Sequence, residues 1–186
     1  MNSVNPFETD AYTKVQHYFF DIPETECTLN DLCKRIKISK TTAKTAVNML
    51  VAEGFLAKQV IGRLWRISCN QKHYYNKSRK IPYHLRLIYE SNIISDIRKI
   101  IPSSRAIILF GSIRKGDDIS QSDIDVAVEV LGGEQKIIEL GKIVQLGYRK
   151  NVHVQVHQFS RNLVNVNVFS NIANGIVLDG FLEVKK

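Results

Sequence analysis

The chain has 186 residues, 44% of them hydrophobic and 24% charged, and its 26 basic and 18 acidic side chains give a net charge of +8. This composition is typical of a folded globular protein, and the length suits one ordinary domain or two small ones. No apolar run approaches the roughly 20 residues of a membrane helix, and the first ten residues lack a signal-peptide core. Three scattered cysteines favour neither a disulfide framework nor a zinc site. We therefore expect a cytoplasmic protein.

The excess positive charge lies in one stretch of the chain. Residues 1–26 carry 1 basic and 5 acidic side chains (net −4), residues 27–80 carry 12 and 2 (net +10), and residues 81–186 carry 13 and 11 (net +2). Such segregation is more typical of a surface that binds nucleic acid than of a basic surface that is exposed only to solvent. The nearly neutral remainder concentrates acid, as a metal site would, at Asp117, Asp118, Asp123 and Asp125.

The first seventy residues have the pattern of three helices followed by a hairpin. Apolar spacing predicts a helix over residues 11–20 and a second, short helix that begins after Thr28 as its N-cap. Ser39 is the N-cap candidate for a third helix, and Gly54 is a natural stop for it. Two short β-rich runs, 56–61 and 64–67, then meet at Gly62 and Arg63, which predicts a hairpin.

This order of elements resembles the winged helix-turn-helix family across residues 11–69. The resemblance implies that the third helix enters the major groove of DNA and that the hairpin contacts the adjacent backbone or minor groove. Short hydroxyl groups and basic groups can reach base edges and phosphates. The DNA-binding candidates are Ser39, Lys40, Thr41, Thr42, Lys44, Thr45, Arg63 and Arg66. Domains of this kind also serve for dimerisation or protein contacts alone, and a homodimer is one expectation by analogy.

Residues 71–102 are expected to link the two halves. The polar and basic stretch 70–80 shows no periodicity and is interpreted as a linker, with Tyr74 and Tyr75 either stacking on nucleic acid or packing on a neighbouring domain. Beyond Pro82, apolar residues at helical spacing predict one long amphipathic helix that ends at Pro102.

Chemistry is suggested by the segment from residue 105 to residue 128. Residues 105–110 form a continuous apolar run, typical of a strand buried on both faces, and it ends at Gly111 and Ser112. Ten residues later, Asp123 and Asp125 begin an alternating stretch that places both side chains on one face of a strand, with their Cβ atoms about 7 Å apart. Two adjacent carboxylates repel unless a cation lies between them, and hard oxygen ligands suit Mg²⁺. A Gly-Ser turn after a buried strand suits a phosphate.

The combination of Phe110-Gly111-Ser112, Gly116 and Ser122-Asp123-Ile124-Asp125 resembles the polymerase-β-like nucleotidyltransferases, in particular their minimal domains. The resemblance implies that Gly111, Ser112 and Ser122 hold a nucleoside triphosphate, ATP or another NTP, and that Asp123 and Asp125 are the catalytic carboxylates, which bind Mg²⁺ or Mn²⁺. The whole chain also resembles a subgroup in which a winged helix precedes such a domain, with an ending like residues 174–180.

One element of the family pattern is missing. The family normally supplies a third carboxylate from a later strand, but the corresponding stretch, residues 151–157, presents Asn151, His153, Gln155 and His157 on its polar face. His153 is a conceivable ligand or base, but a lone strand histidine is more often a surface residue. Glu129 lies about 13 Å beyond Asp125 along the strand, too far to complete the site. The gap leaves nucleotide and metal binding better supported than full transfer activity.

The expected fold is therefore α/β (α+β), with a winged helix-turn-helix domain (1–70), a linker and long helix (71–102), and a minimal nucleotidyltransferase-like domain with a mixed sheet flanked by helices (103–186). The expected function is DNA binding joined to Mg²⁺-dependent transfer of a nucleotide to an unknown acceptor hydroxyl. Two alternatives remain open: a transcriptional regulator whose transferase domain is degenerate, and a toxin–antitoxin component that modifies a protein or tRNA.

Overall fold

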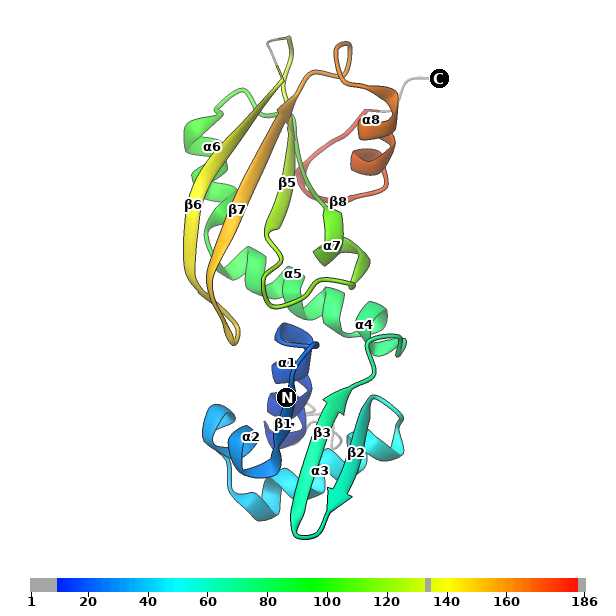
Figure 1. Ribbon diagram of the computed structural model, residues 1–186. Helices are drawn as coiled ribbons and strands as arrows, with labels where there is room; N and C mark the ends of the chain where they lie inside the picture. The colour runs from blue at the N-terminus through cyan, green and yellow to red at the C-terminus, as the bar shows by residue number, and fades with distance from the viewer. Residues whose placement is uncertain (1–9, 133–134, 184–186) are drawn as a thin grey trace, which may run out of the picture. The chain divides into compact units, whose positions relative to one another are not determined.

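The computed structural model describes residues 10–132 and 135–183. The chain divides into two compact units, Met1–Lys80 and Ile81–Lys186, and each is described by itself (Figure 1). Within the described ranges, no helix is both long enough and apolar enough to cross a membrane.

The N-terminal unit contains helices and a small antiparallel sheet. Its elements are α1 (Asp10–Asp21), β1 (Glu26–Thr28), α2 (Leu29–Ile36), α3 (Lys40–Ala52), β2 (Leu56–Ile61), β3 (Leu64–Cys69) and α4 (Tyr75–Ser78). The sheet order is β1-β3-β2, so the short β1, which periodicity did not predict, pairs with the hairpin. The expected helices and the hairpin turn at Gly62 and Arg63 are confirmed.

Local side-chain chemistry sets the helix ends in this unit. The Thr28 hydroxyl oxygen accepts a hydrogen bond from the Asp31 N–H at 3.2 Å, and the Ser39 hydroxyl oxygen accepts one from the Thr42 N–H at 3.1 Å. Both residues are therefore the N-caps that the sequence predicts. Gly54, at φ +79°, follows α3 in the left-handed conformation that a helix stop of this kind requires.

Residues 70–80, expected to be a linker, fold onto the N-terminal unit. Tyr75 is buried, packs against Phe55 with ring centroids 5.7 Å apart, and donates a hydrogen bond to Glu53 Oε2 at 3.0 Å. Arg79 donates to the Tyr12 hydroxyl oxygen at 2.8 Å and covers the Tyr75 ring. Tyr74, in contrast, is 63% exposed. The packing of Tyr75 lies within its own unit, because the contacts that hold the segment come from residues 12, 53 and 55.

The C-terminal unit is a mixed five-stranded sheet with helices on both faces. Its elements are α5 (Lys80–Glu90), α6 (Ile93–Ile100), β4 (Ala106–Phe110), α7 (Gly111–Lys115), β5 (Ile124–Glu129), β6 (Lys136–Leu146), β7 (Arg149–Phe159), α8 (Val166–Ala173) and β8 (Ile176–Gly180). The strand order is β6-β7-β5-β4-β8, and β5 and β7 are parallel whereas the other neighbours are antiparallel. The long helix expected after Pro82 is instead two helices, because Asn92 adopts a left-handed conformation (φ 64°) between α5 and α6.

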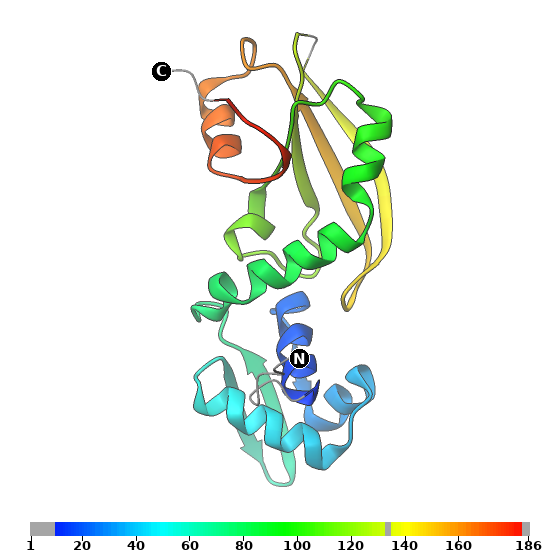
Figure 2. The same ribbon diagram turned by 180° about the vertical axis from the view of Figure 1, so that it is seen from behind.

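Alternation along the strands gives the sheet two different faces. One face packs against α5 and α6, which Figure 2 shows in front of the sheet, through residues such as Ile97, Leu109 and Val126. The other face packs against α8 through Ile108 and Phe159, among others. β4 lies between β5 and β8 and is buried almost throughout, as its apolar run predicts. Because side chains alternate, odd-numbered residues of β5 lie on the α8 face.

Candidate functional site

Asp123 and Asp125 lie where β5 begins, on the α8 face of the sheet. Asp125 is paired in register with Phe110 at the end of β4 and with Gln155 in the parallel strand β7. Asp123 immediately precedes the strand, and its Oδ2 accepts a hydrogen bond from Gln155. Gln155 contacts Asp123 and is the register partner of Asp125. Both carboxylates therefore lie beside Gln155 on one face of the sheet, as the period-two spacing predicts.

The Gly-Ser turn is packed directly against these aspartates. Gly111 has φ +74°, and a Cβ built on it would collide with Oδ2 of Asp125. Two independent constraints therefore require glycine here, the left-handed backbone and the close approach of a carboxylate. Ser112 follows in the first turn of α7, and that short helix ends at Gly116, also in the left-handed conformation. The turn that links β4 to α7 thus borders the Asp125 carboxylate.

Strand β7 contributes two polar side chains that sequence reasoning did not assign to the site. Nε2 of Gln155 donates to Oδ2 of Asp123 at 2.8 Å. Nε2 of His157 lies 3.7 Å from Oδ1 of Asp125, and its ring contacts the Phe110 ring edge to face at 5.1 Å. The alternation of residues 151–157 places these side chains on the polar face, but only the parallel pairing of β5 with β7 shows that they meet the aspartates.

Ser122 holds the loop before Asp123 in shape. The Ile119 N–H donates to the Ser122 hydroxyl oxygen at 2.9 Å, and the Ser122 N–H donates back to the Ile119 carbonyl at 3.0 Å. The hydroxyl hydrogen of Ser122 is not used by this turn, so the residue can still donate to a ligand.

Other acidic residues near the sheet are already engaged elsewhere. Asp118, which the sequence groups with the expected metal site, is buried and pairs with Arg149 at 3.2 Å. Glu129 is also buried, and its Oε1 accepts from Arg161 at 2.7 Å. The grouping of Asp118 with the metal site is therefore wrong, because a fully buried arginine already neutralises it, and Glu129 stays out of the site as its spacing predicts.

A comparison with known families agrees with this geometry. Residues 90–173 match the family model described as a nucleotidyltransferase domain. This segment is a polymerase-β-like nucleotidyltransferase domain. The match runs from α6 through α8 and so contains the Gly-Ser turn, both aspartates and Gln155. The chain has no match among curated proteins.

The carboxylates of the nucleotidyltransferase domain suit a divalent cation that arrives with its nucleotide. Mg²⁺ typically keeps several waters and is held by one or two carboxylates together with substrate phosphates. Across residues 10–132 and 135–183, no group of three or more His, Cys, Asp or Glu side chains is arranged to hold an ion. Asp123 and Asp125 are the residues that would hold Mg²⁺ or Mn²⁺ together with the phosphates of an NTP.

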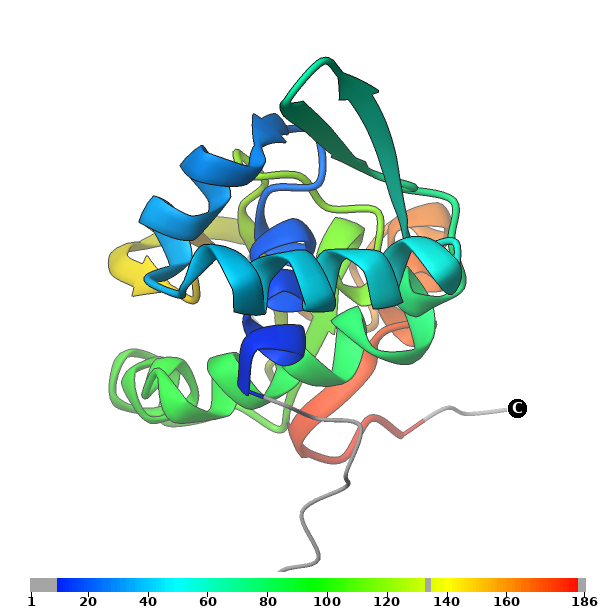
Figure 3. The ribbon, with the colours of Figure 1, turned by 90° about the horizontal axis from the view of Figure 1, so that it is seen from below.

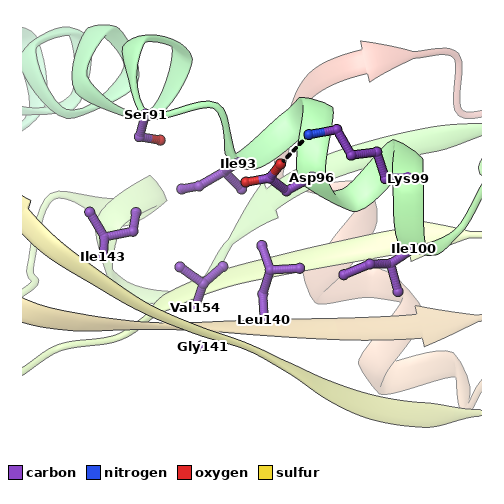
Figure 4. Close-up of a pocket in the computed structure, with 9 residues that line it drawn as sticks. All are labelled: Ser91, Ile93, Asp96, Lys99, Ile100, Leu140, Gly141, Ile143 and Val154. Atoms are coloured by element: carbon purple, nitrogen blue, oxygen red, sulfur yellow. Dashed lines mark hydrogen bonds and ion pairs between the residues drawn. The ribbon is translucent and has the colours of Figure 1, made fainter.

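A pocket of about 420 Å³ lies on the opposite face of the nucleotidyltransferase sheet, between α6 and strands β6 and β7 (Figure 4). Its walls are mostly apolar, with Ile93, Leu140 and Val154 among them, and its charged groups, Asp96 and Lys99, pair with each other at 2.8 Å. Val154 and Gln155 point to opposite faces, so the sheet separates this pocket from the aspartates. No group in the pocket suggests chemistry.

The structure also locates the residues predicted to bind DNA, in the N-terminal unit. Those of the third helix are all exposed, at Ser39, Lys40, Thr41, Thr42, Lys44 and Thr45. Figure 3 shows α3 in cyan and the β2–β3 hairpin in teal. A small pocket of about 110 Å³ between the start of α2, α3 and the hairpin is lined by Lys40, Lys44, Arg63 and Trp65, among others.

The two predicted arginines of the hairpin have different surroundings. Arg63 lies at the exposed turn and lines the small basic pocket. Arg66 lies on β3 and forms an ion pair with Glu26 of β1 at 2.5 Å. The basic pocket therefore brings together Lys40, Lys44 and Arg63, while Arg66 is directed to an acidic neighbour.

Proposed function

We propose that the C-terminal unit binds a nucleoside triphosphate with Mg²⁺ or Mn²⁺ and transfers a nucleoside monophosphate to an acceptor hydroxyl. The close packing of Gly111 against Asp125 carries this proposal. It brings the turn suited to phosphate beside the carboxylates suited to the cation, inside a nucleotidyltransferase domain.

The residues would act mainly by positioning and charge neutralisation. In the transfer, the acceptor oxygen forms a bond to the α-phosphorus, the bond from that phosphorus to the bridging oxygen breaks, pyrophosphate leaves, and the hydroxyl proton passes to solvent. Asp123 and Asp125 would orient the triphosphate through the cation, which when bound offsets the charge on phosphate. Ser112 and Ser122 would donate hydrogen bonds to phosphate oxygens. Few side chains are needed, because phosphoryl chemistry of this kind depends on geometry and electrostatics.

The test is label transfer from NTPs carrying a labelled α-phosphate, with RNA and protein acceptors and with Mg²⁺ or Mn²⁺. Label transfer that is lost in Asp123→Ala/Asp125→Ala supports the proposal. Asp96→Ala is the control, because Asp96 lies on the opposite face of the sheet. Nucleotide binding without transfer to any acceptor would favour a regulator with a non-catalytic domain. Transfer to one protein or tRNA would favour the toxin–antitoxin alternative. Equal, weak nucleotide binding by wild type and the double variant would overturn the site.

We further propose that the N-terminal unit is a winged helix-turn-helix that binds DNA. Three observations support it: the order of helices and hairpin with the sheet order β1-β3-β2, the exposed polar face of α3, and the net charge of +10 on residues 27–80. The convergence of Lys40, Lys44 and Arg63 on one pocket adds a position for a backbone phosphate.

DNA binding is tested by gel shift across a range of salt concentrations. Affinity should fall steeply with salt and should fall again in Lys40→Ala/Lys44→Ala, because phosphate contacts release counterions. The matched control is Lys72→Ala/Lys77→Ala, which removes two exposed lysines of the same basic segment outside α3 and the hairpin. Indifference to salt and to the α3 lysines would exclude this function.

A further inference from the structure

The unusual feature of the site is the strand β7 that borders it. Where a third carboxylate would complete an ion-binding cluster, β7 presents the amide of Gln155 and the ring of His157. The next acidic residues along the neighbouring segments are unavailable, because Asp118 is held by Arg149 and Glu129 by Arg161. Asp123 and Asp125 are contacted from β7 by Gln155 and His157, and the acidic residue Glu139 lies one strand further away, on β6, as the register partner of Gln155.

Gln155 presents a hydrogen-bond donor, not a ligand, to the first carboxylate. Its Nε2 lies 2.8 Å from Oδ2 of Asp123, so one amide hydrogen points at the side of this oxygen where a cation would otherwise bind. An amide N–H carries partial positive charge, and it disfavours a cation in the same place.

His157 restricts the second carboxylate in the same way. Its Nε2 faces Oδ1 of Asp125 at 3.7 Å, and the edge-to-face contact with Phe110 fixes the ring. The other oxygen of Asp125, Oδ2, is the one against Gly111 and the phosphate-binding turn. Oδ2 of Asp125 therefore faces the turn, whereas Oδ1 of Asp125 and Oδ2 of Asp123 are contacted by side chains of β7.

We propose, resting on the nucleotide-binding function above, that this centre holds a single divalent cation with its nucleotide and that Gln155 bars a second one. Paired-metal sites place two cations about 3.5–4 Å apart and need shared anionic ligands to offset their mutual repulsion. Asp123 and Asp125 supply two carboxylates, and the phosphates of the nucleotide add further anionic ligands, so the limit to one cation lies in the amide that β7 presents, at Gln155, where a third carboxylate would stand. Gln155 is a positioning residue in this scheme, acting through Asp123.

The test counts metal ions on the full-length protein. Equilibrium dialysis with Mn²⁺ and α,β-methylene-ATP, which resists cleavage at the reacting bond, gives the ratio of Mn²⁺ to nucleotide bound per chain. Wild type should bind one Mn²⁺ per nucleotide. Gln155→Glu, which replaces the amide by a carboxylate of the same length, should bind two. Gln158→Glu is the matched control, because it makes the same change on the same strand at a residue of opposite parity, and it should remain at one.

Each outcome decides the inference. Two Mn²⁺ per nucleotide on wild type would overturn it and leave the proposed function standing, and a ratio of one in Gln155→Glu would show that Gln155 is not what limits the count. Nucleotide and Mn²⁺ binding that is absent from wild type, or unchanged in Asp123→Ala/Asp125→Ala, would overturn the proposed site as well. If circular dichroism shows that Gln155→Glu does not fold, the wild-type ratio decides whether the centre holds a single cation, one supporting that part of the inference and two refuting the whole.

Discussion

Arg149 and Asp118 form an ion pair from which solvent is excluded on both sides, with Nη1 of Arg149 3.2 Å from Oδ2 of Asp118. The same Nη1 donates to the Ile119 carbonyl at 3.0 Å, and Nδ1 of His84 lies 3.6 Å from the same Asp118 oxygen. Asp118 and Ile119 belong to the loop between the Gly-Ser turn and the aspartates, whereas Arg149 begins β7. The pair therefore fastens the loop that precedes Asp123 to the strand that carries Gln155.

Breaking this pair from one side should be costly. Arg149→Met removes the guanidinium that lies 3.2 Å from the buried Asp118 carboxylate, and we expect the free energy of unfolding to fall by about 3–5 kcal/mol. Asp118→Leu/Arg149→Met should recover much of the loss, because the buried carboxylate is then removed together with its guanidinium. Urea unfolding followed by circular dichroism measures both.

The control for that prediction is Arg86→Met. Arg86 forms an exposed pair with Glu90 at 3.7 Å on α5, so its loss should cost less than about 1 kcal/mol. Equal losses in the free energy of unfolding for Arg86→Met and Arg149→Met would contradict the prediction that breaking the buried ion pair costs more than breaking the exposed one.

Gly111→Ala should damage the site more than its backbone strain alone explains. A left-handed alanine costs on the order of 1–3 kcal/mol, and the added Cβ must also displace the Asp125 carboxylate. Gly132→Ala is the matched control in the same unit, since Gly132 has φ +72° but its Cβ would meet no atom within 4 Å. We expect nucleotide affinity, measured by calorimetry with Mg²⁺, to fall at least about tenfold only in Gly111→Ala, a difference of about 1.4 kcal/mol. Unchanged nucleotide affinity in Gly111→Ala would show that the turn is not part of the nucleotide site.

The parts of the fold that depend on local chemistry were predictable from sequence. Thr28 and Ser39 are caps because their hydroxyls reach an N–H three residues ahead, and the hairpin turns at Gly62 because both flanking runs favour strands. Likewise Asp123 and Asp125 share a face because strand side chains alternate.

The parts that depend on distant partners were not predictable in the same way. Segment 70–80 has no periodicity of its own, and its order comes from contacts of Tyr75 with Glu53 and Phe55. Asp118 and Asp123 look alike in sequence, but only the first meets a buried arginine, which comes from a strand 31 residues later. The role of Gln155 follows from the register of two parallel strands, which composition and spacing do not encode.

The thiols of Cys27 and Cys69 in the N-terminal unit should report on its unfolding. Burial raises the pKa of Cys27 to about 11 and that of Cys69 to about 12. Both thiols are therefore protonated at pH 8 in the folded unit, whereas an unfolded cysteine with a pKa of about 8.5 is partly thiolate. Alkylation by iodoacetamide at pH 8, followed by mass spectrometry, should be at least about tenfold slower in buffer than in urea. Native labelling of Cys69 as fast as in urea would contradict the raised pKa of its half-buried thiol.

Arg63 and Arg66 provide a discriminating pair for the DNA-binding proposal. Arg63 lines the basic pocket with Lys40 and Lys44, so Arg63→Ala should weaken DNA binding and reduce the slope of log affinity against log salt by about 1. Arg66 is already paired with Glu26, so Arg66→Ala should change both quantities much less. Gel shift at several salt concentrations measures the slope for each variant. A larger effect of Arg66→Ala would place the nucleic acid against β1 and β3 and away from the pocket between α3 and the hairpin.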